Sequence, residues 1–166
     1  VDGIKTGHTQ DAGYCLVASA ERNGMRLISV VMGTESTKAR KNDTASLFNY
    51  GFHFFQTKTL MEAMTELAKP RIWKGQQDYV PVGLLDKVVL TLPRGKHEEI
   101  VITVEVNAQI VAPLAKGDPV GTVTASLDGE TKFQAPVVAL ESVEPAGFFA
   151  RLWDTLLMFV ASLFGT

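Results

Sequence analysis

The tripeptide Lys5-Thr6-Gly7 is the pattern in this sequence that most directly suggests chemistry. On a strand, the same three residues occur in serine enzymes that transfer acyl groups. Acyl transfer also needs a nucleophile, a base and hydrogen-bond donors directed at the developing oxyanion. Taken alone, the tripeptide is more often a strand that ends in a turn, so its residue types leave both interpretations open.

The serines of the chain do not supply a recognisable nucleophile. None of the seven is followed at the third position by a lysine, and no Ser-x-Asn sequence occurs. We therefore expect that these 166 residues hydrolyse nothing unless a further segment is supplied.

The remaining reactive side chains predict neither a metal site nor a cofactor. His8, His53 and His97 are widely separated and show no metal-ligand spacing. Cys15 is the single cysteine and lies in an apolar run, which indicates a small buried side chain rather than a nucleophile.

The segments that follow the tripeptide predict elements able to hold it in place. Residues 4–6 are expected to form a strand, and residues 13–32 are expected to form a β-hairpin. The hairpin has an Asn-Gly turn at residues 23–24, a strong signal because both residues tolerate positive φ.

A helix is expected over residues 36–55, with Ser36 or Thr37 as its cap. Arg40 stands between two lysines in its first turns and is most simply a solvated residue. The expected buried face recurs at three and four residues and consists of Ala45, Phe48 and Phe52.

Short apolar runs separated by turn residues begin near Gln56 and indicate an antiparallel β-sandwich. Residues 58–69 fit a helix as well as a strand, so their structure is left open. The predicted strands lie at residues 71–73, 87–92, 100–106, 120–127 and 131–140.

The last twenty residues, 147–166, have a different pattern. At helical spacing, Arg151, Asp154, Thr155 and Ser162 share one narrow side, and aromatic and aliphatic residues occupy the rest. This pattern predicts an amphipathic helix that lies in a membrane interface, since a span would need roughly 20 apolar residues. The apolar surface should consist of Phe148, Phe149, Leu152, Trp153, Leu156, Phe159, Leu163 and Phe164.

Composition and charge exclude other classes. Hydrophobic residues make up 46% of the chain and charged residues 20%, as in proteins that bury a core. A formal charge of -2 with scattered Lys and Arg offers no basic field, so we expect no nucleic-acid partner. The chain opens without Met or a charged leader, and we interpret it as a fragment of a longer protein.

Residues 2–9, 12–14, 16–20 and 26–33 together resemble the D-alanyl-D-alanine carboxypeptidases of the bacterial envelope, which are low-molecular-mass penicillin-binding proteins of the penicillin-binding protein 5 type. The resemblance extends over nearly the whole chain and is densest in the first 55 residues. Further matching positions are Arg40 and residues 50–52, 90–95, 112–114, 120–122 and 148–149.

The resemblance implies roles for the residues that match the family's motif. Lys5 would supply positive charge and help to relay a proton, and Thr6 would hydrogen-bond the terminal carboxylate of the substrate. Gly7 would let the substrate lie close to the strand, and the backbone N–H of His8 would be one oxyanion donor. Arg40 would anchor the substrate carboxylate, for which a guanidinium is well suited.

The resemblance also implies an α+β architecture in three parts. Residues 1–55 would be the last strands and helix of a serine β-lactamase/transpeptidase-like catalytic domain. Residues 56–146 would form an all-β antiparallel sandwich, and residues 147–166 a membrane-anchor helix at the periplasmic face of the inner membrane.

Two functions from different classes fit these observations. In the first, the parent protein is a serine D-alanyl-D-alanine carboxypeptidase that trims the terminal D-alanine from peptidoglycan pentapeptides through an acyl-enzyme and is trapped by β-lactam antibiotics. In the second, the chain is a non-catalytic β-sandwich spacer or docking module at a membrane surface, with cell-wall enzymes as candidate partners of the sandwich. An upstream Ser-x-x-Lys would favour the first.

Overall fold

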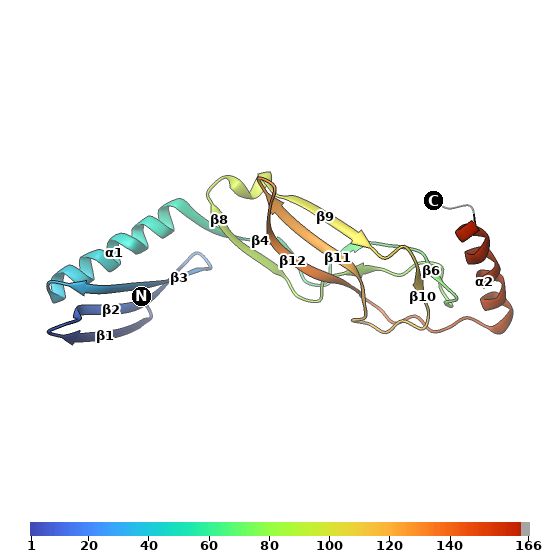
Figure 1. Cartoon of the computed structure of the whole chain (residues 1–166), viewed down its shortest axis with the longest axis horizontal. Helices are drawn as coiled ribbons and strands as arrows, with labels where there is room; N and C mark the ends of the chain where they lie inside the picture. The colour runs from blue at the N-terminus through green and yellow to red at the C-terminus, as the bar shows by residue number, and fades with distance from the viewer. Residues whose placement is uncertain (164–166) are drawn as a thin grey trace. The chain divides into compact units, whose positions relative to one another are not determined.

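The computed structural model describes residues 1–163, with side chains described through residue 160. The chain divides into two compact units (Figure 1). Unit 1 comprises Val1–Lys58 and Val89–Glu98, and unit 2 comprises Thr59–Val88 and Glu99–Thr166. The predicted domain ranges 1–55, 56–146 and 147–166 remain a prediction.

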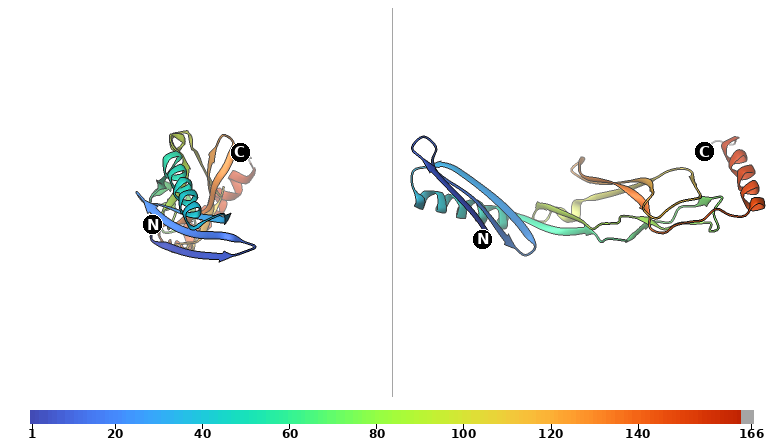
Figure 2. Two further views of the ribbon diagram at one scale, coloured as in Figure 1. Left: turned by 90° about the vertical axis from the view of Figure 1, so that its left-hand side faces the viewer. Right: turned by 90° about the horizontal axis from the view of Figure 1, so that it is seen from below.

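Unit 1 contains a three-stranded antiparallel sheet in the order β1-β2-β3, with helix α1 along one face (Figure 2). The turn between β2 and β3 is made by Asn23 and Gly24, both at positive φ, as the Asn-Gly signal predicts. Two-residue turns of this kind match the right-handed twist of the strands. The bounds are β1 Gly3–Thr9, β2 Gly13–Arg22, β3 Met25–Thr34 and α1 Thr37–Phe54.

Helix α1 begins as the sequence indicates, but its buried face differs from the expected one. The Ser36 hydroxyl accepts a hydrogen bond from the Ala39 N–H at 3.1 Å and caps the helix. Thr44 lies against the sheet with Phe48 and Phe52, whereas Ala45 is exposed. The prediction for Ala45 was wrong because the contact stripe follows every fourth residue, 44, 48 and 52, and includes a polar side chain.

Unit 2 contains a five-stranded sheet in the order β5-β7-β12-β11-β9, in which neighbours are antiparallel. A separate pair, β6 and β10, is parallel, with Ile110 opposite Ile72. The expectation of an all-antiparallel sandwich is therefore wrong for this pair, because two-residue strands carry no sequence signal for direction. The bounds are β5 Glu66–Ala68, β6 Ile72–Trp73, β7 Val82–Gly83, β9 Val101–Val106, β10 Ile110–Val111, β11 Pro119–Leu127 and β12 Glu130–Ala139.

Strands β4, Phe55–Met61, and β8, Val88–Pro93, pair in a further two-stranded sheet, and the 3-10 turn η1, Lys96–Glu99, follows β8. Of residues 58–69, which the sequence leaves open between helix and strand, residues 58–61 lie in β4 and residues 66–68 in β5, and residues 62–65 connect the two strands. In unit 1, the Arg94 guanidinium donates to the carbonyls of Phe52 and His53 at 2.9 and 2.8 Å. These bonds satisfy carbonyl groups at the C-terminal end of α1 that have no partner within the helix.

Helix α2, Phe148–Leu163, carries a wide exposed apolar surface, as the tail pattern predicts. Phe148, Phe149, Leu152, Trp153, Leu156 and Phe159 are each more than half exposed. The predicted contributions of the Ser162, Leu163 and Phe164 side chains lie outside the described side chains. Among the described residues, no helix is long and apolar enough to cross a bilayer.

The glycine at position 121 is required by close strand packing in unit 2. A Cβ on Gly121 would lie 2.2 Å from the Glu105 carbonyl oxygen of the neighbouring strand β9. We expect Gly121→Ala to lower the free energy of unfolding by about 1–3 kcal/mol or more, since backbone atoms must move to admit the methyl group. A urea melt measures the change. Gly147→Ala is the matched control, because a Cβ there meets nothing within 4 Å, and an equal loss in both variants would contradict the packing argument.

Unit 1 should be the less stable of the two units. Ile28, Val30 and Met32 are more than half exposed on its sheet. The buried hydroxyls of Ser29 and Thr44 have no hydrogen-bond partner within the described part of the chain. Each such hydroxyl costs about 1–3 kcal/mol. We expect amide hydrogens of β1–β3 and α1 to exchange faster than those of β11 and β12, as measured by native-state hydrogen exchange. Strong and equal protection in both units would overturn this expectation.

Candidate functional site

The tripeptide lies on β1, an edge strand of the unit 1 sheet, and every residue of this strand is exposed. The Lys5 ammonium donates to the Thr6 carbonyl at 3.0 Å. Adjacent side chains of a strand project to opposite faces, so Lys5 and Thr6 can meet one ligand only along the open edge of β1. An extended peptide placed along this edge would be within reach of both.

Arg40 comes from α1 but lies against the end of this edge strand. One terminal nitrogen, Nη1, donates to the carbonyls of Gly7 and Cys15, each at 3.1 Å. The Nε atom is buried and has no hydrogen-bond partner among the residues that the structure describes. The structure therefore brings Arg40, which is 33 positions from Gly7 in sequence, to the predicted tripeptide.

Tyr14 connects the two predicted residues His8 and Arg40, and sequence reasoning did not identify it as part of the site. The ring centroids of His8 and Tyr14 are 4.0 Å apart, and the Arg40 guanidinium carbon lies 5.5 Å from the Tyr14 ring centroid. The Thr34 hydroxyl donates to the Tyr14 carbonyl at 2.9 Å. The register places Tyr14 directly opposite His8, so pairing residues outward from the β1–β2 turn could have revealed this contact.

Gly7 is not required by the packing of unit 1. A Cβ at this position would make an ordinary contact of 3.9 Å with the Cys15 Cβ, and the backbone does not adopt a positive φ. The neighbouring protein atoms therefore tolerate a larger residue at position 7. This leaves close approach of a ligand as a reason for a glycine here.

A charge cluster holds the start of β1 to the hairpin. The Arg26 guanidinium pairs with Asp2 and Glu21 and donates to the Ser19 hydroxyl at 2.7 Å. The hydrogen bond from Arg26 holds the pKa of the Asp2 carboxyl below its usual value, and the same contact raises the pKa of Arg26. The cluster is solvent-exposed and orients the strand that carries the tripeptide.

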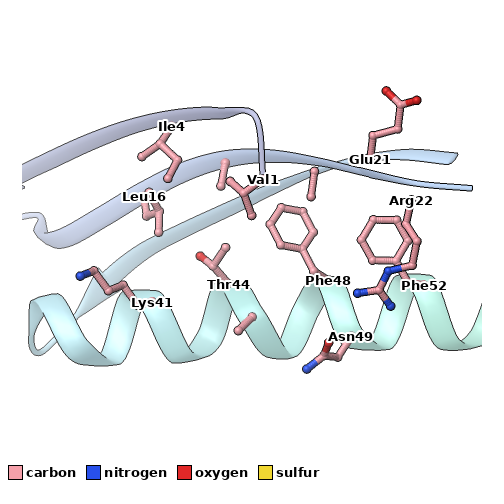
Figure 3. A pocket seen from close by; sticks show the side chains of 13 residues that line it. Val1, Ile4, Leu16, Glu21, Arg22, Lys41, Thr44, Phe48, Asn49 and Phe52 are labelled. Carbon is pink, nitrogen blue, oxygen red and sulfur yellow. The ribbon is translucent and has the colours of Figure 1, made fainter. Parts of the chain in front are cut away.

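An apolar groove with a volume of about 420 Å³ lies in unit 1 between α1 and the sheet. Figure 3 shows Ile4, Leu16, Phe48 and Phe52 around this space, with Lys41 and Arg22 among the charged residues that line it. Its walls offer no paired acid and base. It is not the site that the tripeptide predicts, because that site lies on the open edge of β1.

The residues that the structure describes contain no cluster of three or more His, Cys, Asp or Glu side chains able to hold a metal. Cys15 is a free thiol, partly buried, and its sulfur lies 3.4 Å from the Ala12 carbonyl oxygen. The chemistry of the candidate site therefore rests on Lys5, Thr6, the backbone around Gly7 and His8, and Arg40.

Two family models match consecutive parts of the chain. The model described as D-alanyl-D-alanine carboxypeptidase matches residues 1–36, and the model described as penicillin-binding protein 5, C-terminal domain, matches residues 55–145. The second match covers more than half of the chain and lies over β4 to β12.

Curated relatives match over the full chain. The D-alanyl-D-alanine carboxypeptidase DacC of Escherichia coli is 40% identical over 167 residues, and DacA of Haemophilus influenzae is 42% identical over 166 residues. These alignments cover 100% and 99% of this chain but 42% of each relative. The chain thus spans about two-fifths of the length of the relatives that it matches.

Solved structures show the same fold. Penicillin binding protein 5 from Haemophilus influenzae has a TM-score of 0.75 and 39% sequence identity, over 84% of this chain and 41% of that chain. A peptidoglycan synthesis regulatory factor, PBP3, from Streptococcus pneumoniae has a TM-score of 0.67 and 25% identity, over 86% of this chain and 43% of that chain.

Proposed function

The chain belongs to the D-alanyl-D-alanine carboxypeptidases of the penicillin-binding protein 5 type, as a C-terminal part, and from this premise we propose that it supplies the edge strand and the arginine of their substrate site. The parent protein would be a serine enzyme that removes the terminal D-alanine from peptidoglycan pentapeptides and is acylated by β-lactams. The proposed nucleophile and base belong to a segment outside these 166 residues.

The position of Arg40 beside the tripeptide is the observation that carries this proposal. Its guanidinium is held by the Gly7 and Cys15 carbonyls, and its buried Nε lacks a partner among residues 1–160, whose side chains are described. A substrate carboxylate at the open edge of β1 would be bound by the cations of Lys5 and Arg40 and the hydroxyl of Thr6. A guanidinium held in place loses little entropy on binding a carboxylate.

Substitutions of Lys5 and Arg40 in a longer protein that includes the nucleophile test this site. We expect Lys5→Ala to lower kcat/KM for a D-Ala-D-Ala peptide by about 100-fold or more, since charge directed at the reacting centre is lost. Arg40→Ala should impair turnover of the peptide by about tenfold or more, because a charge-assisted bond to the carboxylate is lost. Lys38→Ala, in the same first turns of α1, is the matched control. Wild-type kinetics in either site variant would remove that residue from the proposed site.

The helix α2 supports a second function at a different scale. We propose that it lies in the plane of the inner membrane and holds the protein at the periplasmic face, with the β-rich residues 56–146 as a spacer or docking surface for cell-wall enzymes. The exposed aromatic and aliphatic side chains of α2 support this function, because an apolar patch of that kind usually marks an interaction surface.

A further inference from the structure

Asp154 of α2 is bound to unit 2 rather than directed at solvent. Its carboxylate accepts a hydrogen bond from the backbone N–H of Lys74 at 2.6 Å, and it lies 3.8 Å from an Arg71 guanidinium nitrogen. The Asp154 side chain is 19% exposed, compared with 46% for Arg71. The sequence pattern places Asp154 on the narrow polar side of the helix, and the structure shows that protein atoms face this side at Asp154. A charged carboxylate can lie against the protein when a backbone N–H donates to it and a cation lies nearby.

The backbone around Lys74 is shaped to make this contact. Lys74 adopts a φ of 60°, in the left-handed region that a lysine rarely occupies. Its carbonyl accepts from the Ala146 N–H at 2.7 Å, and its own N–H donates to Asp154. Lys74 therefore bonds both the segment that leads into α2 and the helix itself. These two attachments, about two helical turns apart along the chain, restrain the direction of the helix on unit 2.

The apolar side of α2 faces away from this attachment. Leu157 and Met158 are half-buried and lie on the same side as Asp154, one turn further along. Leu152 and Leu156 are each about 160° around the helix from Asp154, at about 100° per residue, and are more than half exposed. The segment of unit 2 that binds Asp154 and the exposed apolar surface thus lie on opposite sides of α2.

We propose that Asp154 is an orientation latch that orients unit 2 on a lipid bilayer so that residues 71–76, which comprise β6 and the bend after it, are directed toward the bilayer. This inference rests on the proposed in-plane membrane binding of α2. A helix is about 10 Å across, so residues 71–76 lie roughly that far behind the lipid-contacting side chains. With α2 sunk about 5–10 Å into the interface, residues 71–76 lie at the level of the lipid headgroups. The latch determines this orientation, and the apolar surface of α2 determines the affinity for the bilayer.

A hydrophobic contact alone does not explain the arrangement. An apolar stripe can rotate about the helix axis with little change in area, whereas the bond from the Lys74 N–H to the Asp154 carboxylate is directional. The Arg71 guanidinium that flanks Asp154 is itself stacked on the Trp73 ring at 4.0 Å. The cation and the donor thus come from the two residues that flank β6, and the acceptor comes from α2.

The first test measures the latch without lipid on the full 166-residue chain. In Asp154→Ala, we expect the exchange protection of the Lys74 amide to fall at least about tenfold, because a charge-assisted hydrogen bond is lost. Val123, at the centre of unit 2, should keep its protection, which excludes global unfolding. Thr155→Val is the matched control, because its hydroxyl bonds the Arg151 carbonyl within the helix. Unchanged Lys74 protection in Asp154→Ala would overturn the latch.

The second test measures the orientation of the protein on vesicles that carry a spin label at the lipid headgroup. For the wild-type chain, we expect the spin label to broaden the NMR signals of α2 and of residues 71–76. In Asp154→Ala, α2 should stay broadened and vesicle partitioning should change less than about threefold, while broadening at residues 71–76 falls by at least about half. No broadening of α2 in the wild-type chain would refute membrane binding itself. If α2 is broadened in both proteins but residues 71–76 are broadened equally in both, or in neither, the latch alone is refuted.

Discussion

Deletion of residues 147–166 is expected to release the protein from phospholipid vesicles while the melting transition of unit 2 persists. The deletion removes six large apolar side chains of α2, each of which is more than half exposed. Transfer of even three of them into lipid would contribute about 4.5–9 kcal/mol before the cost of immobilisation. Loss of this transfer free energy should reduce the affinity for vesicles by several orders of magnitude, since each 1.4 kcal/mol changes an affinity about tenfold.

The β-structure should survive the deletion because the core of unit 2 does not depend on α2. Its fully buried side chains come from strands and connecting segments that the deletion leaves intact. These side chains include Ile72, Val80, Val82, Val120, Val123, Val137 and Val143.

Flotation with vesicles and a thermal melt on the same samples test both parts of this expectation. A double variant, Leu152→Glu with Leu156→Glu, should also stop flotation, because a charge is costly to bury among lipid tails. Thr155→Glu, on the flank of the same helix, is the matched control and should still float. If the truncated chain floats, or if it loses its transition, the anchor assignment is wrong.

The second large effect concerns covalent chemistry with penicillin. We expect the isolated 166-residue chain to form no adduct with a labelled penicillin, because acylation requires a serine activated by a neighbouring base. None of its seven serines is followed at the third position by a lysine, and the Ser29 hydroxyl is buried among packed side chains. The expected mass shift is therefore zero.

Intact-mass spectrometry after incubation with excess labelled penicillin measures this directly. A longer protein that contains both this chain and a Ser-x-x-Lys segment is the positive control, and it should gain one equivalent of label. Stoichiometric labelling of the isolated chain would show that a nucleophile is present within these 166 residues. No labelling of the longer protein would instead count against the proposed enzyme.

Local signals in the sequence determined the first part of the fold well. The Asn23-Gly24 turn and the Ser36 cap both act through a residue's own backbone or its near neighbours, so their effect does not depend on distant packing. The helix that follows Ser36 and the short strands of the later part of the chain followed from changes in apolar spacing, and the resemblance implied the α+β class. The tripeptide and its flanking residues also identified the family, because the resemblance depends only on the order of residues along the chain.

Only the tertiary structure decided which side chains meet. The contact between Tyr14 and Arg40 depends on the position of α1 on the sheet, which cannot be seen from residue types. The parallel pairing of β6 and β10 depends on contacts between segments nearly 40 positions apart, and two-residue strands carry no periodic pattern. Helical spacing puts Asp154 on the polar side of the tail but does not identify the partner of its carboxylate. Its partner is a backbone N–H about 80 positions away, brought there by folding, and a backbone donor carries no signature in the sequence.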